Sequence, residues 1–167
     1  MKKLTFLMLF IAITTSLFSQ EKTWQNKSIA LGIGQPYGIA GVKTEMTTFS
    51  QNVIFEAGAG YNFVDDIVFN FGIVYNKNIA SWLDLNAGVM YGANQVLEVS
   101  TIDGNKSVTS YGASLHIGWD ILLSNHIAIE IGNAIILTRS NDYKNLLSLT
   151  NTKPSDITLE LGVKYNF

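Results

Sequence analysis

The chain alternates apolar and polar residues in eight separate segments, and this pattern restricts its fold more than any other feature. The last segment, Ile157–Phe167, is the clearest, with an apolar residue at every second position. Successive side chains of a β-strand point to opposite faces, so this period predicts strands with one apolar and one polar face. Asn133 interrupts the apolar face of one strand, where a β-bulge is the one explanation that the pattern offers. The other predicted strands are Ser28–Gly34, Gly38–Thr47, Asn52–Phe63, Ile67–Asn76, Trp82–Val96, Thr109–Ile121 and His126–Thr138.

The connections between these segments are short or long in a regular order. In an antiparallel meander, every second connection lies at the same end of the sheet. One end receives the short turns Thr48–Gln51, Lys77–Ser81 and Leu122–Asn125, and the other receives the short Gln35–Tyr37 and Val64–Asp66 with the long Leu97–Val108 and Arg139–Ser155. We therefore expect one lopsided end with two long loops, which present Asp103-Gly-Asn-Lys106 and Arg139–Ser155.

The composition of the two faces indicates which one points inward. Twelve of the fourteen glycines lie on the polar face. Glycine weakens a strand, so the narrow interior of an eight-stranded barrel explains this distribution better than a solvated exterior does. Aromatic residues near strand ends lie on the apolar face, as in the girdles of membrane barrels: Tyr61, Tyr75, Tyr91, Tyr111, Trp119, Tyr165 and Phe167. The prediction is an all-β, closed antiparallel eight-stranded transmembrane β-barrel with a polar, glycine-rich interior and an apolar exterior. A secreted lipocalin-like barrel, with its apolar face inward, is the alternative fold.

Residues 1–19 predict an export signal. A pair of lysines precedes the apolar run Leu4–Leu17. This run is shorter than the ~20 apolar residues that a spanning helix needs, so we expect a signal peptide that is cleaved between Ser19 and Gln20 after export by the general secretory pathway. Residues 20–167 are then a single barrel domain. The chain has no Cys, which excludes a lipoprotein anchor and a disulfide framework.

Charged residues on the polar face are predicted to lie inside the barrel. Burying unpaired charges is unfavourable, so we expect a hydrogen-bonded ion network centred on two lysines. The predicted members are Lys43, Glu45, Glu56, Asp84, His116, Asp120, Glu130, Glu160 and Lys164. Two lysines do not match six carboxylates, so we expect some carboxylates to be protonated or to reach water at one mouth. We interpret the network as a structural plug that fixes the strand register.

The sequence offers little catalytic chemistry. Acyl hydrolysis or transfer needs a base, usually His, beside a Ser or a water molecule. The two histidines, His116 in mid-strand and His126 at the end with the short turns, are both predicted to face inward. The chain contains no Gly-Xaa-Ser-Xaa-Gly motif and no close pair of His for a metal. We therefore expect no catalytic residues, no cofactor and no metal site.

The charge balance argues against one class of partner. The chain has 11 Lys and Arg against 13 Asp and Glu, and no basic cluster. Proteins that bind nucleic acids carry a basic patch or stripe. The sequence therefore predicts no nucleic-acid partner.

The segment Ile157–Phe167, the alternating strands and the Trp and Tyr girdles resemble the small eight-stranded outer-membrane proteins, of the OmpX type and the OmpA membrane domain. The Ser19–Gln20 junction is similar to the signal peptides of Bacteroidota. The resemblance implies a monomer in the cell outer membrane, in contact with outer-membrane lipids and lipopolysaccharide. It also implies that the barrel-assembly machinery reads the terminal strand, with Tyr165 and Phe167 as the assembly signal.

We therefore expect a non-enzymatic outer-membrane protein with a structural or surface-interaction role, carried by the two long loops. Binding residues concentrate on loops that a rigid scaffold holds in place. The alternatives are a lipid A-modifying outer-membrane enzyme and a narrow, porin-like ion conductor. Eight strands leave no continuous aqueous channel, which disfavours the conductor.

Overall fold

The computed structural model describes residues 25–47, 50, 52–62, 67–101, 104–148 and 154–167. The predicted signal peptide, its cleavage site and Asp103 lie outside these described residues. The elements are β1 (Gln25–Gly34), the 3-10 turn η1 (Gln35–Tyr37), β2 (Ile39–Thr47), β3 (Val53–Tyr61), β4 (Ile67–Ala80), β5 (Leu83–Thr101), β6 (Gly104–Leu122), β7 (Ile127–Ile136), the helix α2 (Asn141–Leu147) and β8 (Ile157–Asn166).

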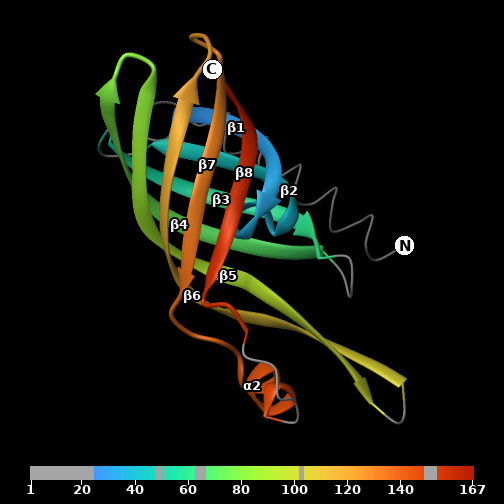
Figure 1. Cartoon of the computed structure of the whole chain (residues 1–167). Helices are drawn as coiled ribbons and strands as arrows, with labels where there is room; N and C mark the ends of the chain where they lie inside the picture. Colours follow the sequence, from blue (N-terminus) through green and yellow to red (C-terminus); the bar gives the residue numbers. More distant parts are fainter. Residues whose placement is uncertain (1–24, 48–49, 51, 63–66, 102–103, 149–153) are drawn as a thin grey trace.

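The eight strands form one closed antiparallel barrel (Figure 1), and the predicted fold class is confirmed. Each strand pairs with its neighbours in chain order, and β1 closes the sheet by pairing with β8. At the closure, Leu31 lies opposite Val163 and Gly32 lies opposite Gly162. Closure leaves no unpaired edge along the shared length of the strands, which is how a barrel satisfies its backbone hydrogen bonds.

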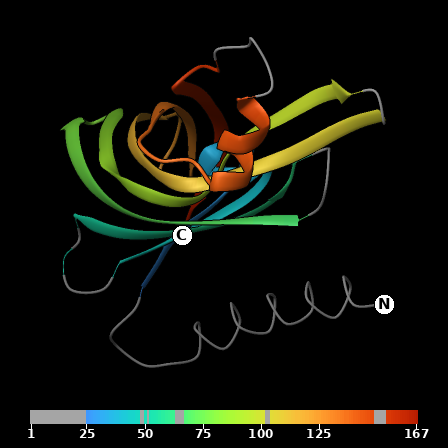
Figure 2. The same cartoon turned by 90° about the horizontal axis from the view of Figure 1, so that it is seen from below.

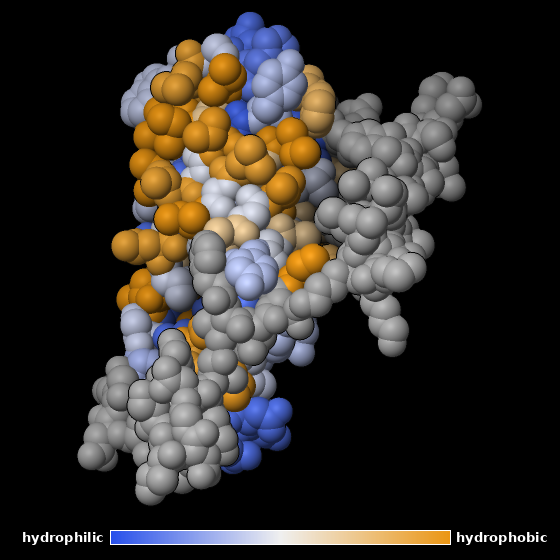
Figure 3. All heavy atoms as spheres, turned by 90° about the vertical axis from the view of Figure 1, so that its right-hand side faces the viewer, coloured by the Kyte–Doolittle hydropathy of each residue, from blue (hydrophilic) through white to orange (hydrophobic). Residues whose placement is uncertain are grey.

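Exposure alternates along the strands with the period that the sequence predicts. In β8, for example, Leu159, Leu161 and Val163 are exposed, whereas Glu160 and Lys164 are buried. Figure 3 shows hydrophobic residues over much of the described barrel wall, with hydrophilic residues gathered toward its ends. The apolar face therefore points outward, which is opposite to the polarity of a lipocalin-like barrel. None of the described helices is long and apolar enough to cross a membrane.

The two ends of the barrel differ. The turn end carries the β2–β3, β4–β5 and β6–β7 connections, and the hairpin end carries η1, the β5–β6 connection and α2 (Figure 1). The prediction that Leu97–Val108 forms a long loop is wrong. The strands β5 and β6 continue as a two-stranded ribbon whose register extends to Thr101 opposite Gly104. The run Val96–Thr101 is rich in β-branched residues, which favour strands. The β4–β5 turn is also tighter than predicted, since β4 runs to Ala80.

The second long connection contains a short helix that packs against the ribbon. In the view from below in Figure 2, α2 lies in front of the barrel and the β5–β6 hairpin projects to one side of it. Tyr143 and Leu146 of α2 form a small hydrophobic cluster with Leu97 of β5. The Tyr143 hydroxyl donates to the Gln95 side chain at 2.8 Å, and the Arg139 guanidinium donates to the same oxygen at 3.1 Å. The predicted loop Arg139–Ser155 is thus partly an anchored element.

The expected bulge at Asn133 is absent from β7. Asn133 keeps regular register with Ile117 on β6 and with Leu159 on β8. The register shifts that do occur lie elsewhere, between Asn26 and Ser28, between Asn78 and Ala80, and between Ala93 and Gln95. We find no structural reason for an amide at this outward position.

The closure between β1 and β8 is testable because the chain has no Cys of its own. In a Leu31→Cys, Val163→Cys double variant the two Cα atoms are direct partners, which suits a disulfide. We expect mild oxidation to form the cross-link in the folded protein, seen as a mobility change on a non-reducing gel.

A matched control moves one cysteine by a single step along the same face. In the Leu31→Cys, Leu161→Cys variant the residues are diagonal neighbours, roughly 7–8 Å apart, beyond the usual disulfide range. Equal cross-linking of both pairs would contradict the register.

Candidate functional site

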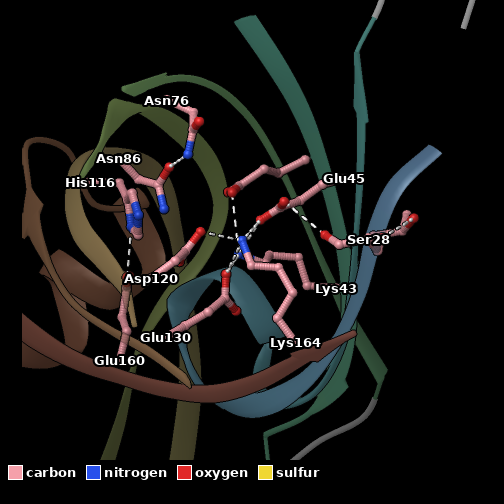
Figure 4. Close-up of polar contacts among 12 residues, drawn as sticks. Ser28, Lys43, Glu45, Asn76, Asn86, His116, Asp120, Glu130, Glu160 and Lys164 are labelled. Carbon is pink, nitrogen blue, oxygen red and sulfur yellow. Dashed lines mark hydrogen bonds and ion pairs between the residues drawn. The ribbon is translucent and has the colours of Figure 1, made fainter. Parts of the chain in front are cut away.

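The most distinctive site is a group of six buried charged residues inside the barrel, toward the turn end. This ion cluster consists of Lys43 and Glu45 from β2, Glu56 from β3, Asp120 from β6, Glu130 from β7 and Lys164 from β8. All six are among the nine residues predicted for the interior network. Figure 4 shows Glu45, Asp120 and Glu130 pointing toward the lysine ammonium groups from different walls of the barrel.

Each lysine contacts three carboxylates. The Lys43 ammonium lies 2.7 Å from Glu130, 3.1 Å from Glu45 and 3.2 Å from Glu56. The Lys164 ammonium lies 2.5 Å from Asp120, 2.8 Å from Glu45 and 3.0 Å from Glu130. Glu45 and Glu130 therefore bridge the two lysines.

The register explains how both lysines reach the same place. Ala30 on β1 is the cross-strand partner of both Lys43 and Lys164. A small residue between two long side chains leaves space for both to lean toward the barrel axis. Four carboxylates surround two ammonium groups, so neutral donors supply further hydrogen bonds: the Ser28 hydroxyl donates to Glu45 at 2.7 Å.

Tyr37 is the main member of the site that sequence reasoning missed. The predicted outer connection Gln35–Tyr37 does not stay outside: η1 folds into the barrel, and all three of its residues are buried. The Tyr37 hydroxyl donates to Glu130, and the Lys43 ammonium lies 5.5 Å from the centre of the Tyr37 ring. Asn70 on β4 donates from its amide to the Gln35 carbonyl.

Glycines on the facing strands make room for this turn. A Cβ atom at Gly162 would overlap the Tyr37 hydroxyl, and one at Gly58 would overlap the Pro36 carbonyl oxygen. The turn itself lies between Gly34 and Gly38, which have φ values of 109° and 63°, a range that glycine adopts at little cost. The glycine-rich polar face therefore reflects the inserted turn as well as the narrow barrel. The sequence signal that could have indicated this inserted turn was Pro36, which lies in a short connection between Gly34 and Gly38.

His116 and Glu160 form a separate buried pair nearer the hairpin end. The His116 Nδ1 atom lies 2.6 Å from a carboxylate oxygen of Glu160. The pair bridges β6 and β8 across Gly132 of β7, a position where a Cβ atom would lie 2.9 Å from the Glu160 carboxylate. The structure thus divides the predicted network into two parts.

Asp84 is the one predicted network residue outside both parts. It is partly exposed and accepts a hydrogen bond of 2.8 Å from the Asn78 amide near the β4–β5 turn. It lines an open cavity of about 700 Å³ at the turn end, together with Lys27, Asn76, Asp120 and Lys164. We refer to this space as the mouth cavity.

The described interior is closed beyond the mouth cavity. A second cavity lies between the ion cluster and the His116–Glu160 pair, and its volume is only about 10 Å³, where one water molecule needs about 10–15 Å³. Tyr37, Lys43 and Glu130 are among the residues that line it. Side chains therefore fill the described barrel between the ion cluster and the His116–Glu160 pair.

The structure places the two histidines differently. His126 was predicted to face inward, but it is exposed at the turn end, and its ring stacks on outward-facing Tyr165 with centroids 5.7 Å apart. It lies one residue before β7 begins, so the strand alternation does not constrain it.

Tyr165 also contacts Phe167 edge to face at 5.6 Å, so the two residues of the predicted assembly signal lie together at the rim. Among the described residues, no three His, Cys, Asp or Glu side chains are arranged to hold a metal ion.

Removing one lysine tests how far the barrel depends on the ion cluster. In a Lys164→Met variant three buried carboxylates lose a partner. Breaking a buried ion pair in this way costs about 3–5 kcal/mol, so we expect a lower urea midpoint for unfolding. Lys144→Met, at an exposed position on α2, serves as the control and should change stability little. Equal stability of both variants would show that the contacts of Lys164 contribute nothing to the free energy of unfolding.

The fit between Tyr37 and the opposite wall is testable by a double-mutant cycle. Gly162→Ala should destabilise the barrel, because its Cβ overlaps the Tyr37 hydroxyl. In a Tyr37→Ala background the same substitution should cost less, with a coupling of about 0.5–3 kcal/mol measured by urea unfolding. Additive effects would mean that the tyrosine does not pack against this glycine.

Comparisons with known proteins identify no family. No family model matches the chain, and no curated protein sequence matches it. Among solved structures, Ail, the attachment invasion locus protein of Yersinia pestis, is similar at 14% sequence identity and a TM-score of 0.40. The match covers 87% of this chain and 99% of that one.

Proposed function

We propose that this chain is an outer-membrane β-barrel protein that acts through its hairpin end, in a structural or surface-interaction role. The observation that carries the proposal is the polarity of the closed barrel: apolar side chains cover most of the exterior, and the six residues of the ion cluster are buried inside. A soluble barrel has no reason to expose rows of Ile, Leu and Val, whereas a bilayer needs them.

The dimensions agree with a membrane span. The shortest strands, β2 and β3, have nine residues each, and β1, β7 and β8 have ten. A tilted transmembrane strand needs ~9–11 residues. Short turns face the periplasm in such barrels and longer connections face outward, so the turn end would lie in the periplasm. Tyr165 and Phe167 would then lie at the periplasmic rim, where the barrel-assembly machinery would read them. The proposal also includes that the barrel works as a monomer.

The hairpin end offers a structured surface for recognition. We call the β5–β6 ribbon beyond the barrel, with α2 packed on it, the outer platform (residues 94–101, 104–110 and 141–147). Gln95 receives hydrogen bonds from both Tyr143 and Arg139, which ties α2 to the ribbon. Arg139 also pairs with Asp156 at 2.7 Å, just before β8. Recognition surfaces need this kind of rigid support.

The interior supports neither rival function. An ion conductor needs a continuous path, but Tyr37 and the ion cluster occupy the described interior. A lipid-modifying enzyme needs its base at lipid level, whereas His116 is buried in the barrel beside Glu160. The other histidine, His126, is exposed, but it lies at the turn end, away from the outer platform, and its ring stacks on Tyr165.

The membrane location predicts a position-dependent cost of charge. Leu161 is exposed near the middle of the apolar exterior, and Leu123 is exposed in the β6–β7 turn. Leu161→Arg should destabilise the barrel in lipid by roughly 2–4 kcal/mol, whereas Leu123→Arg should cost about 0–1 kcal/mol. The measurement is urea unfolding of each variant in phospholipid vesicles. Equal effects, or a protein that stays soluble without detergent, would contradict the proposal.

Shortening the outer platform tests the surface role. Replacing residues 97–108 by Asn-Gly joins the register partners Val96 and Thr109 through a favoured two-residue turn. We expect the barrel to fold and to enter the outer membrane, while adhesion or envelope permeability changes in cells that carry it. The surface-charge variant Asp142→Asn, Lys144→Gln retains the anchor of α2 and tests whether the exposed face of the platform is involved.

Two further measurements separate the rivals. Mass spectrometry of lipid A from cells with and without the protein would reveal a lipid-modifying activity. Steady single-channel conductance in planar bilayers, lost on Glu56→Gln and Glu130→Gln, would reveal an ion path. Either result, or wild-type behaviour of the shortened platform in every adhesion and permeability assay, would overturn the surface role.

A further inference from the structure

An apolar groove interrupts the outer wall of the barrel on the turn-end side of β4 and β5. It has a volume of about 390 Å³, and its outward-facing lining is Val53, Ile73, Tyr75, Ala87, Val89 and Leu115. The groove arises because Ala87 stands where the neighbouring strands carry large residues: its cross-strand partners are Tyr75 and Ile117.

Polar groups stand at the end of the groove that faces the turn end. Lys77 follows Tyr75 by two residues on the same face of β4 and is exposed. Its cross-strand partner on β5 is the apolar Leu85, so no carboxylate lies opposite it on that strand. The Tyr75 hydroxyl accepts a long hydrogen bond of 3.4 Å from the Asn52 amide, which leaves the hydroxyl proton available to an acceptor.

An apolar groove that ends in a cation and a hydroxyl donor matches one class of ligand. An acyl chain is apolar along its length, and a phosphodiester is an anionic acceptor at the end of such a chain. Lys and Tyr at a membrane interface extend their polar ends toward the headgroup layer while their apolar parts stay in lipid. This charge complementarity selects a phospholipid rather than an uncharged lipid.

We propose that this groove is a binding site for a diacyl glycerophospholipid of the periplasmic leaflet. One acyl chain lies against Ala87, and the phosphate lies between Lys77 and the Tyr75 hydroxyl. The inference rests on the proposed membrane location, because only that orientation brings the turn end to the periplasmic leaflet. The inference adds to the proposed membrane location a defined lipid site on one side of the barrel.

Native mass spectrometry of the folded protein, released from detergent micelles, tests the site directly. The probes are dioleoyl phosphatidylglycerol and dioleoylglycerol, which share their acyl chains and differ in the phosphate headgroup. We expect the wild type to retain one phosphatidylglycerol, with a preference of about tenfold over dioleoylglycerol, the size of effect that one charge-assisted contact gives. Equal retention of both lipids by the wild type would overturn the proposal.

Two variants assign the parts of the site. Ala87→Phe fills the groove and should reduce retention of both lipids, and Lys77→Gln should remove the preference for phosphatidylglycerol while dioleoylglycerol binding remains. The matched controls are Ala113→Phe, on the outward face of β6 and outside the groove lining, and Lys144→Gln on α2. Both controls should behave like the wild type.

The outcomes separate this site from the proposed function. If Ala87→Phe and Lys77→Gln bind as the wild type does while the protein still folds only in detergent or lipid, the site is wrong and the membrane location stands. If the protein folds without detergent, the membrane location itself fails, and the lipid site fails with it. Loss of retention in the Ala113→Phe control would also overturn the assignment to this groove.

Discussion

The structure depends on how a narrow closed barrel accommodates charge. Eight strands leave space for little more than side chains, so every charged group that faces inward needs a partner within the barrel. Lys43 and Lys164 meet this need by joining carboxylates from β2, β3, β6 and β7, elements that are far apart in the sequence. The same contacts fix which strands face one another, because a register slip by one residue would send these charges to the apolar exterior.

The inserted η1 turn extends this packing toward the hairpin end. The Tyr37 hydroxyl donates to Glu130 and its ring lies close to the Lys43 ammonium, so Tyr37 links the β1–β2 connection to the ion cluster. The space for it comes from glycines on β1, β3 and β8, including Gly32, Gly58 and Gly162. Barrel closure, turn insertion and charge pairing therefore depend on one another, and the described interior around Tyr37 and the ion cluster is tightly packed.

The surfaces at the two ends of the barrel and along its wall differ in polarity. The turn end has a polar mouth cavity that stops at Lys164 and Asp120, and the hairpin end has the outer platform anchored through Gln95. Burial raises the pKa of the Tyr143 hydroxyl of α2 above its usual value, and this hydroxyl donates to Gln95. The exterior wall between the two ends is apolar, and the groove at Ala87 is a local hollow in it.

The sequence by itself determined the eight strands, their two faces and most of the charged residues of the interior, because alternation of period two is a local property of the chain. It predicted the closed eight-stranded barrel correctly. Tertiary structure alone decided which of the charges meet: Asp84 lies at the mouth and His116 pairs with Glu160, since cross-barrel contacts depend on register between distant strands. It also decided that residues 35–37 fold inward and that Leu97–Val108 is a ribbon. Loop length along the chain carries no information about whether a connection finds packing partners, and those partners exist only once the barrel has closed.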